Sequence, residues 1–303
     1  MTTLETVPPR PFRFGLVAGS APDGRAYADL ARKAESLGFS SLLIPDAPGQ
    51  TPAAFPMLAW AAAATSTLHV GTYVLSNDLH HPLHIARDAA TLAVLSGGRF
   101  ELGLGAGRPG SEADHRAFGL SWDAPAVRFE RLRASVGIVQ DLFAGNTVDR
   151  EESFYPMEGA SLQIALSEGH RPPILIAAGG DRMLAFAGRV ADIVALGMAP
   201  AASLEEARAR SRIVLDAATG REHPPELNVN LAGAGSAIHP WLQRALEPRR
   251  DELVAAGAPA LLLGDTAQMA EQVHRLRDEL GVTYITAPAE LIDDLAPVIR
   301  ELG

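Results

Sequence analysis

Short β-type segments alternate with longer amphipathic segments along the whole chain, and this order constrains the fold more than any other feature. The amphipathic segments place apolar residues at helical spacing; residues 25–38, for example, end at Gly38, a residue type preferred just past a helix. Such alternation predicts a parallel sheet wrapped by helices. The predicted strands are 12–17, 40–44, 68–75, 99–107, 172–180, 192–196, 226–233 and 282–286.

Eight strands with intervening helices predict an α/β fold of the (β/α)8 TIM-barrel type. Such a barrel commonly takes about 250 residues, so the 303 residues can form one domain spanning 1–303. Residues 146–171 break the rhythm, and their Phe, Tyr and Pro residues suggest an insertion that covers the barrel mouth. Residues from about 240 to 280 are predicted as one long helical stretch that ends at Gly281.

Charge and composition restrict the partners. The formal net charge of −10 argues against nucleic acid and anionic membranes, because both are polyanions. The absence of cysteine excludes disulfides, thiol catalysis and thiolate metal sites. The N-terminus lacks a signal-peptide pattern, and no apolar run reaches the roughly 18–20 residues that span a bilayer. We therefore expect a cytoplasmic protein that acts on a small molecule.

Ligands of a (β/α)8 barrel bind at the loops that follow the strands. This rule selects Asp46 after the second predicted strand, residues 76–81 after the third and residues 106–112 after the fourth. It also selects residues 179–182 after the fifth strand and Met198 after the sixth.

Two glycine-rich turns could hold a phosphate. Gly179 and Gly180 precede a predicted helix, where free backbone N–H groups and the helix dipole attract an anion. Gly103, Gly105 and Gly107 form a similar run after the fourth strand. Glycine also serves any tight strand-to-helix turn, so each run alone is equally compatible with a structural role. Two such turns facing each other favour phosphate binding.

The segment from Asp78 to His84 contains metal-ligating residue types. His80 and His81 are adjacent and would diverge, and no further ligands follow at a metal-binding spacing, so we expect no metal. Charged residues past the fourth strand fit either a solvated loop or ligand contacts. These residues are Arg108, Glu112, Asp114 and His115.

Two segments of the sequence carry a resemblance to a known family. They are TSTLHVGTYVLSNDLHHPLHIARDAATLAVLSGGRFELGLGAGRPGSE and PPILIAAGGDRMLAFAGRVADIVALG. In their residue patterns and in the order of these patterns, they resemble the bacterial luciferase-like monooxygenase superfamily, and most closely its coenzyme F420-dependent oxidoreductases. ELNVNLAG and other segments extend the similarity over nearly the whole chain.

The resemblance implies an oxidoreductase that binds FMN or the deazaflavin F420 without a covalent bond. Catalysis would be hydride transfer with F420, or oxygenation with O2 and reduced FMN from a separate flavin reductase. A homodimer is common among similar proteins. The residues implied in cofactor binding include a bulge after strand three, sometimes with a non-prolyl cis peptide. They are Ser76, Asn77 and Asp78 at the bulge, Ala106 and Gly107, Ala178, Gly179 and Gly180 at the phosphate, and Met198.

One departure from the family pattern concerns the mechanism. The F420-dependent branch usually has Asp-His after strand two, whereas this chain has Asp46 followed by Ala47. The missing imidazole often takes part in proton transfer. Asp46 keeps its place, and His81, Arg108 or His115 could substitute for the histidine. A non-catalytic cofactor-binding relative is the alternative reading.

Overall fold

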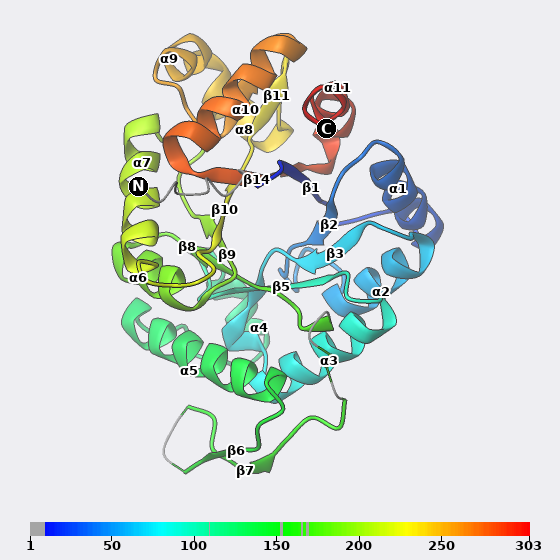
Figure 1. The fold of residues 1–303 in the computed structure, drawn as a ribbon, viewed down its shortest axis with the longest axis vertical. Coiled ribbons are helices and arrows are strands. Elements are labelled where there is room, and N and C mark those ends of the chain that lie inside the picture. Colours follow the sequence, from blue (N-terminus) through cyan, green and yellow to red (C-terminus); the bar gives the residue numbers. More distant parts are fainter. Residues whose placement is uncertain (1–9, 109, 152–153, 165, 168–169) are drawn as a thin grey trace, which may run out of the picture.

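Eight parallel strands close into a ring in the computed structural model, which describes residues 10–303 except 109, 152–153, 165 and 168–169. Around the ring, each strand pairs with the next, and β3 pairs with β5 and β1 with β14 to complete it. Figure 1 looks into this ring. The predicted (β/α)8 barrel is confirmed. Its strands are β1 (Arg13–Val17), β2 (Ser41–Ile44), β3 (His69–Thr72), β5 (Phe100–Gly105), β8 (Ile174–Ala178), β9 (Ile193–Leu196), β10 (Glu226–Asn230) and β14 (Val282–Pro288).

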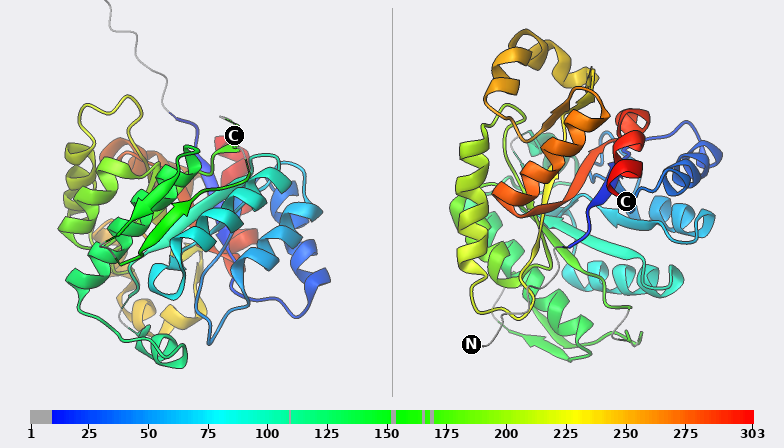
Figure 2. Two further views of the ribbon diagram at one scale, coloured as in Figure 1. Left: turned by 90° about the horizontal axis from the view of Figure 1, so that it is seen from below. Right: turned by 45° about the horizontal axis from the view of Figure 1, so that its top comes forward.

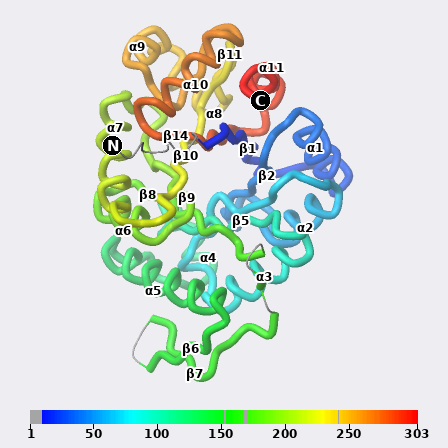
Figure 3. Tube along the Cα trace, viewed as in Figure 1, coloured from blue at the N-terminus to red at the C-terminus, as the bar shows by residue number. Residues whose placement is uncertain are grey.

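Helices surround the barrel, as the tube in Figure 3 also shows. Local signals set their ends: Asp23 caps the N-terminus of α1, Pro82 begins α3, and Gly281 ends α10 in the left-handed conformation. None of the described helices is both long and apolar enough to cross a membrane. The outer helices are α1 (Gly24–Ser36), α2 (Ala54–Ala64), α3 (Pro82–Leu95), α5 (Pro125–Phe143), α6 (Asp181–Val190), α7 (Leu204–Ala217), α10 (Thr266–Leu280) and α11 (Ile292–Leu302).

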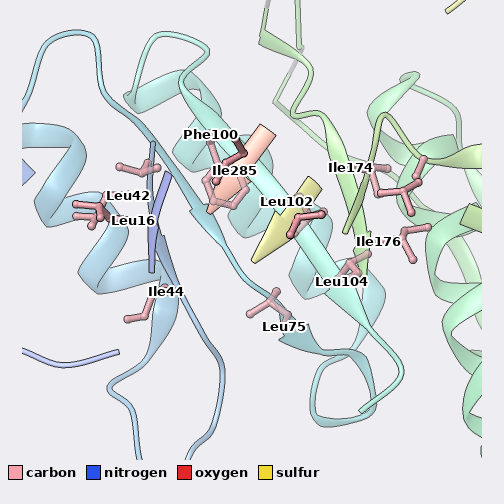
Figure 4. Close-up of a cluster of buried hydrophobic side chains, with 14 of the residues drawn as sticks. Leu16, Leu42, Ile44, Leu75, Phe100, Leu102, Leu104, Ile174, Ile176 and Ile285 are labelled. Carbon is pink, nitrogen blue, oxygen red and sulfur yellow. The ribbon is translucent and has the colours of Figure 1, made fainter. Parts of the chain in front are cut away.

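Alternate residues of each strand face opposite sides of the barrel wall. One set packs against the helices and forms the main hydrophobic core; Figure 4 shows Leu42, Ile44, Leu102 and Leu104 among these side chains. The other set, which includes Leu43, forms a separate cluster with Leu175, Ile193, Ala195 and Tyr284. The barrel wall is therefore packed on both faces.

Buried polar groups cluster at the N-terminal ends of the strands. Arg13 forms ion pairs with Glu101 and with Glu226, and the Glu226 carboxylate is 2.8 Å away. The Arg13 guanidinium also lies over the ring of Tyr284. The Tyr284 hydroxyl lies 2.5 Å from Ser41 Oγ and 3.2 Å from Glu101 Oε2. Burial raises the pKa of Tyr284 well above its usual value. This N-terminal network lies at the end of the barrel opposite the strand ends where ligands bind.

The third predicted strand is interrupted. Residues 68–75 form β3 and the short β4 (Leu75–Ser76), with a cis peptide between Tyr73 and Val74. The strand alongside leaves room for this break, because a Cβ atom on Gly105 would lie 2.7 Å from Val74. Gly103 and Gly105 are thus strand residues that admit the β3–β4 connection, and they do not form the phosphate turn predicted for them.

The stretch 240–280 is not one long helix. Between β10 and β14 the chain forms β11 (Gly233–Gly235), β12 (Ala237–Ile238), α8 (Pro240–Leu246), α9 (Arg250–Ala255), β13 (Leu261–Leu263) and then α10. The three strands form a small separate sheet. Gly257 takes a left-handed conformation after α9, so the helical pattern stops there. This excursion has a hydrophobic cluster of its own, including Leu246, Leu253 and Leu261.

Residues 146–171 contain a hairpin of β6 (Val148–Arg150) and β7 (Met157–Ala160). Figure 1 shows the hairpin outside the helix ring, beside α5. Figure 2 shows the whole ribbon from two other directions. Its Tyr155 reaches inward to hydrogen-bond Asn77. None of the described residues in this segment lines a cavity at the strand ends. The prediction that the insertion covers the mouth is therefore wrong for the described part of the segment.

Candidate functional site

A cavity of about 630 Å³ lies at the C-terminal ends of β2, β4, β5, β8 and β9. We call it the central cavity. Its walls combine small and apolar residues with a few polar groups, a composition typical of cofactor sites. Eight of the residues predicted from the sequence line it together: Asp46, Ser76, Ala106, Gly107, Arg108, Ala178, Gly179 and Met198.

A groove of about 490 Å³ continues from the central cavity, and Ala106, Gly107 and Gly179 line both. We call it the turn groove. Gly180, the ninth predicted residue, lies here as the N-cap of α6, and no atom stands within 4 Å of the position that a Cβ atom on it would occupy. The first amide groups of α6 have no intrahelical acceptor. The turn groove therefore offers an open helix N-terminus to an anion.

Arginine side chains surround these two spaces. Arg210 lines the central cavity from α7 and donates a hydrogen bond to the Gly179 carbonyl oxygen. Arg128, buried in α5, lines the turn groove and donates to the carbonyl oxygens of Ala106 at 2.6 Å and Gly107 at 3.0 Å. Its guanidinium also stacks on Trp122. Both turns are thus held by cations in a chain whose net charge is −10.

Asp46 is the carboxylate of the central cavity, and its side chain is 9% exposed. Its Oδ2 accepts the backbone N–H of Ser76 at 3.0 Å and lies 2.8 Å from Nε2 of His80. His80 comes from the segment just before α3, 34 residues further along the chain. The structure thereby places an imidazole on Asp46 although residue 47 is alanine.

The other histidines predicted for catalysis lie elsewhere. His81 caps α3, is exposed and lines none of the cavities at the strand ends. Partial burial and the neighbouring His84 lower the pKa of His81. His115 is buried, packs edge-on against Trp122 and hydrogen-bonds the Ser111 carbonyl oxygen.

Asn77 and Asp78 also lie behind the cavity wall. Asn77 donates to the Tyr155 hydroxyl at 3.1 Å, and Asp78 pairs with Arg131 at 2.7 Å. The implied bulge with its cis peptide is present, but it lies at Tyr73–Val74, before these residues. Of the three predicted bulge residues, Ser76 alone lines the central cavity. Its hydroxyl has no hydrogen-bond partner within the described part of the structure.

Tyr73 connects the cavity with the barrel interior. It lines the central cavity, and its hydroxyl donates to Asn228 Oδ1 at 2.7 Å. Burial raises the pKa of Tyr73 to about 12, so the phenol stays protonated at neutral pH. Asn228 is fixed in turn by the Tyr284 carbonyl oxygen at 3.1 Å. The cavity floor is therefore held rigidly.

The short helix α4 (Glu112–Ala117) and its flanking loops lie over this end of the barrel. Arg108 and Ser111 line the central cavity, and Asp114 accepts the backbone N–H of Gly49, in the connection between β2 and α2, at 3.3 Å. The Arg108 side chain is exposed and makes no ion pair with the described residues. This segment therefore contributes to the wall of the central cavity, whereas none of the described residues of 146–171 lines it.

These residues fit a flavin or deazaflavin. Val74, Leu75, Ala106 and Met198 provide apolar walls for a flat ring. The open N-terminus of α6 and Arg210 suit a phosphate. The sequence selects His80 only as one of residues 76–81 and gives it no catalytic role, and it does not point to Tyr73, Arg128 or Arg210. Arginines on amphipathic helices look like solvated residues.

Residues 10–234 match the protein family described as luciferase-like monooxygenase. An F420-dependent glucose-6-phosphate dehydrogenase from Nakamurella multipartita is 36% identical over 207 residues, which are 63% of this chain and 58% of the relative. A phthiodiolone/phenolphthiodiolone dimycocerosates ketoreductase from a Mycobacterium species is 37% identical over 125 residues, 41% of this chain and 32% of that protein. The matches thus span less than two thirds of these relatives.

Two solved structures share the fold over nearly all of this chain. The F420-dependent tetrahydromethanopterin reductase of Methanopyrus kandleri superposes with a TM-score of 0.76 at 18% identity, covering 97% of this chain and 100% of that one. The oxygenating component of 3,6-diketocamphane monooxygenase from Pseudomonas putida, in complex with FMN, gives 0.70 at 19% identity, covering 97% and 96%.

Proposed function

This chain belongs to the luciferase-like monooxygenase family, and from that premise we propose that it is an oxidoreductase whose central cavity binds F420 or FMN. The observation that carries the proposal is the pairing of an apolar cavity at the strand ends with an open helix N-terminus beside it. The ring of the cofactor would lie over Val74, and its phosphate would meet the amides at Gly180 and the guanidinium of Arg210.

We favour F420 over FMN. Several of the matched relatives are named as F420-dependent glucose-6-phosphate dehydrogenases. The turn groove extends the binding space beyond the phosphate position, and Arg128 and Arg182 line it together with one carboxylate, Asp181. An extended anionic tail would therefore find both room and positive charge there. FMN, which the diketocamphane monooxygenase structure contains, is the second candidate.

The chain's own residues would position the reactants and move one proton. The bound cofactor supplies hydride transfer as F420, or oxygen activation as reduced FMN. The Asp46 carboxylate fixes the Nε2 side of His80, so the free Nδ1 can accept a proton from a substrate oxygen or return it. The α4 segment would exclude water from the cavity.

The non-catalytic alternative rested on Ala47, and the position of His80 on Asp46 removes its main support. We also propose that the chain forms one domain, since β1 pairs with β14 in the barrel wall. A cytoplasmic location is a further proposal, supported by the absence of cysteine, which suits a reducing compartment. A homodimer through α2 is a further proposal, because every side chain of that helix is apolar and Trp60 is 56% exposed. If FMN is the cofactor, a separate flavin reductase would supply it reduced.

Equilibrium titrations with F420 and with FMN, followed by absorbance and fluorescence, test the function. We expect saturable binding of one of them and its substrate-dependent reduction or reoxidation. Failure of both cofactors to bind would overturn the proposal, and tight binding without turnover of any alcohol, ketone or aldehyde would support the non-catalytic alternative. Gel filtration of the same preparation tests the dimer.

A further inference from the structure

A second cavity of about 420 Å³ adjoins the central cavity, and Asp46 and Leu75 line both. We call it the side cavity. The connection between β2 and α2, the first turns of α3 and Phe118 form the rest of its walls. A molecule in the side cavity could therefore reach past Asp46 toward a ring bound in the central cavity.

The hydrogen-bonding end of the side cavity is the Asp46–His80 pair. His80 lines the side cavity and not the central one, and its side chain is 33% exposed. Nε2 is held by Asp46 at 2.8 Å, and Nδ1 has no hydrogen-bond partner among the described residues. The pair thus presents one fixed carboxylate and one free ring nitrogen to a ligand oxygen.

The remaining walls are mainly apolar. Pro52, Phe55, Pro56 and Ile85 line the side cavity together with Phe118, which is 54% exposed although it is large and apolar. A ligand with a hydrocarbon body would cover the Phe118 ring and remove apolar surface from water.

The charge of the side cavity excludes an anionic ligand. Asp46 and Asp88 line it, and none of the described lining residues is lysine or arginine. The nearby Arg87 lies 3.5 Å from Asp88 and hydrogen-bonds His84, and it is outside the lining. His80 and His84 also line it, but His80 is already paired with Asp46. A phosphate would therefore meet two carboxylates without a lysine or arginine to balance them.

We propose that the side cavity binds the apolar body of an uncharged alcohol or ketone beside the Asp46–His80 pair. An alcohol hydroxyl would donate to Nδ1 of the neutral imidazole, and a ketone oxygen would accept from Nδ1–H of the protonated one. This inference rests on the proposed function, which places the redox cofactor in the central cavity. It separates this chain from relatives named for glucose 6-phosphate, because a sugar phosphate does not suit these walls.

Saturation-transfer NMR on the full chain without cofactor tests the side cavity independently of the redox reaction. Cyclohexanol is the uncharged probe and glucose 6-phosphate the anionic one.

Ala53→Trp fills the side cavity from the exposed start of α2, and Phe118→Ala removes an exposed wall that the fold does not need. Ala255→Trp, exposed on α9 and outside every cavity described above, is the control. F420 and FMN titrations on each variant report on the central cavity.

We expect a cyclohexanol signal in the unmodified protein and in Ala255→Trp, with a loss of at least fivefold in Ala53→Trp and a clear reduction in Phe118→Ala. Glucose 6-phosphate should neither bind nor displace cyclohexanol, and the cofactor Kd should be the same in all variants. Unchanged cyclohexanol binding in both site variants, or displacement by glucose 6-phosphate, would overturn the inference. Absence of cofactor binding alone would contradict the proposed function while leaving the cyclohexanol result decisive for the side cavity.

Discussion

Val74 packs against Gly105 so closely that a Cβ atom on residue 105 would lie 2.7 Å from Val74 Cγ2. Valine is stiff about χ1 and cannot turn away easily. We expect Gly105→Ala to destabilise the protein by about 1–3 kcal/mol, the usual cost of overpacking. It should also weaken cofactor binding, because Val74 lines the central cavity. Urea unfolding measures the first effect and cofactor titration the second.

Gly137→Ala is the matched control for that substitution. Gly137 lies inside α5 with no atom within 4 Å of a Cβ position, so alanine should stabilise the helix by about 0.5–1 kcal/mol. Equal effects of the two substitutions would contradict the packing explanation for Gly105.

Tyr284→Phe tests whether the N-terminal network serves stability. Loss of the hydroxyl removes the hydrogen-bond partner of Ser41 Oγ and of Glu101 Oε2, while Glu101 keeps its ion pair with Arg13, and this costs about 1–3 kcal/mol. Cofactor binding should not change. Tyr27→Phe is the control, because the buried Tyr27 hydroxyl has no partner among the described residues and its removal should be neutral or stabilising. Denaturant unfolding that ranks the two variants in the opposite order would refute this role.

The barrel could be predicted from the sequence because each β/α unit carries its own local pattern of apolar residues, turns and caps. Two of the errors of fold have local causes. Residues 68–75 are rich in β-forming side chains and give no sign of a break at Tyr73–Val74. Leu261–Leu263 form a short apolar run that also fits helical periodicity. The sequence therefore predicts a helix at these residues, where the structure has β13.

The cavity positions that follow strands could be predicted because the barrel brings all those loops to one end. The directions of the side chains could not be predicted in this way. Asp46 and His80 meet because β2 and β4 end close together, and nothing near His80 in sequence distinguishes it from His81, which points outward. Arg210 reaches the Gly179 turn from a helix whose pattern predicts a solvated arginine.

The Glu35 carboxylate links α1 to the start of β3, and it predicts a specific pH dependence of stability. Its Oε1 accepts the backbone N–H groups of Ser66, Thr67 and Leu68 at 2.6–3.0 Å. Desolvation opposes ionisation, but these hydrogen bonds outweigh it and lower the pKa of Glu35 from 4.5 to about 2. The resulting stability is present above pH 4.5 and is lost as the pH falls toward 2. The difference in unfolding free energy between the unmodified protein and Glu35→Gln should shrink over that range. A difference independent of pH would show that ionisation of Glu35 does not contribute.

Arg210→Gln tests the cation at the phosphate turn. Removing one charge-assisted contact should raise the cofactor Kd about tenfold, which corresponds to 1.4 kcal/mol. Arg212→Gln, exposed on the same helix and outside the cavities, should leave the Kd unchanged. Fluorescence titration at two salt concentrations separates the charge effect from a structural one. Equal Kd values for the two variants would argue against a role for Arg210 in binding.

Cofactor titration of Gly180→Asp and Gly180→Asn tests the central claim most directly, that the phosphate of a flavin-type cofactor occupies the N-terminus of α6. The position is open and its φ of −104° suits either residue, and both are good helix caps, so neither variant should lose stability. The aspartate would place a negative charge where the phosphate binds. We predict a Kd at least tenfold higher for Gly180→Asp than for Gly180→Asn. Equal Kd values for the two variants would contradict the account.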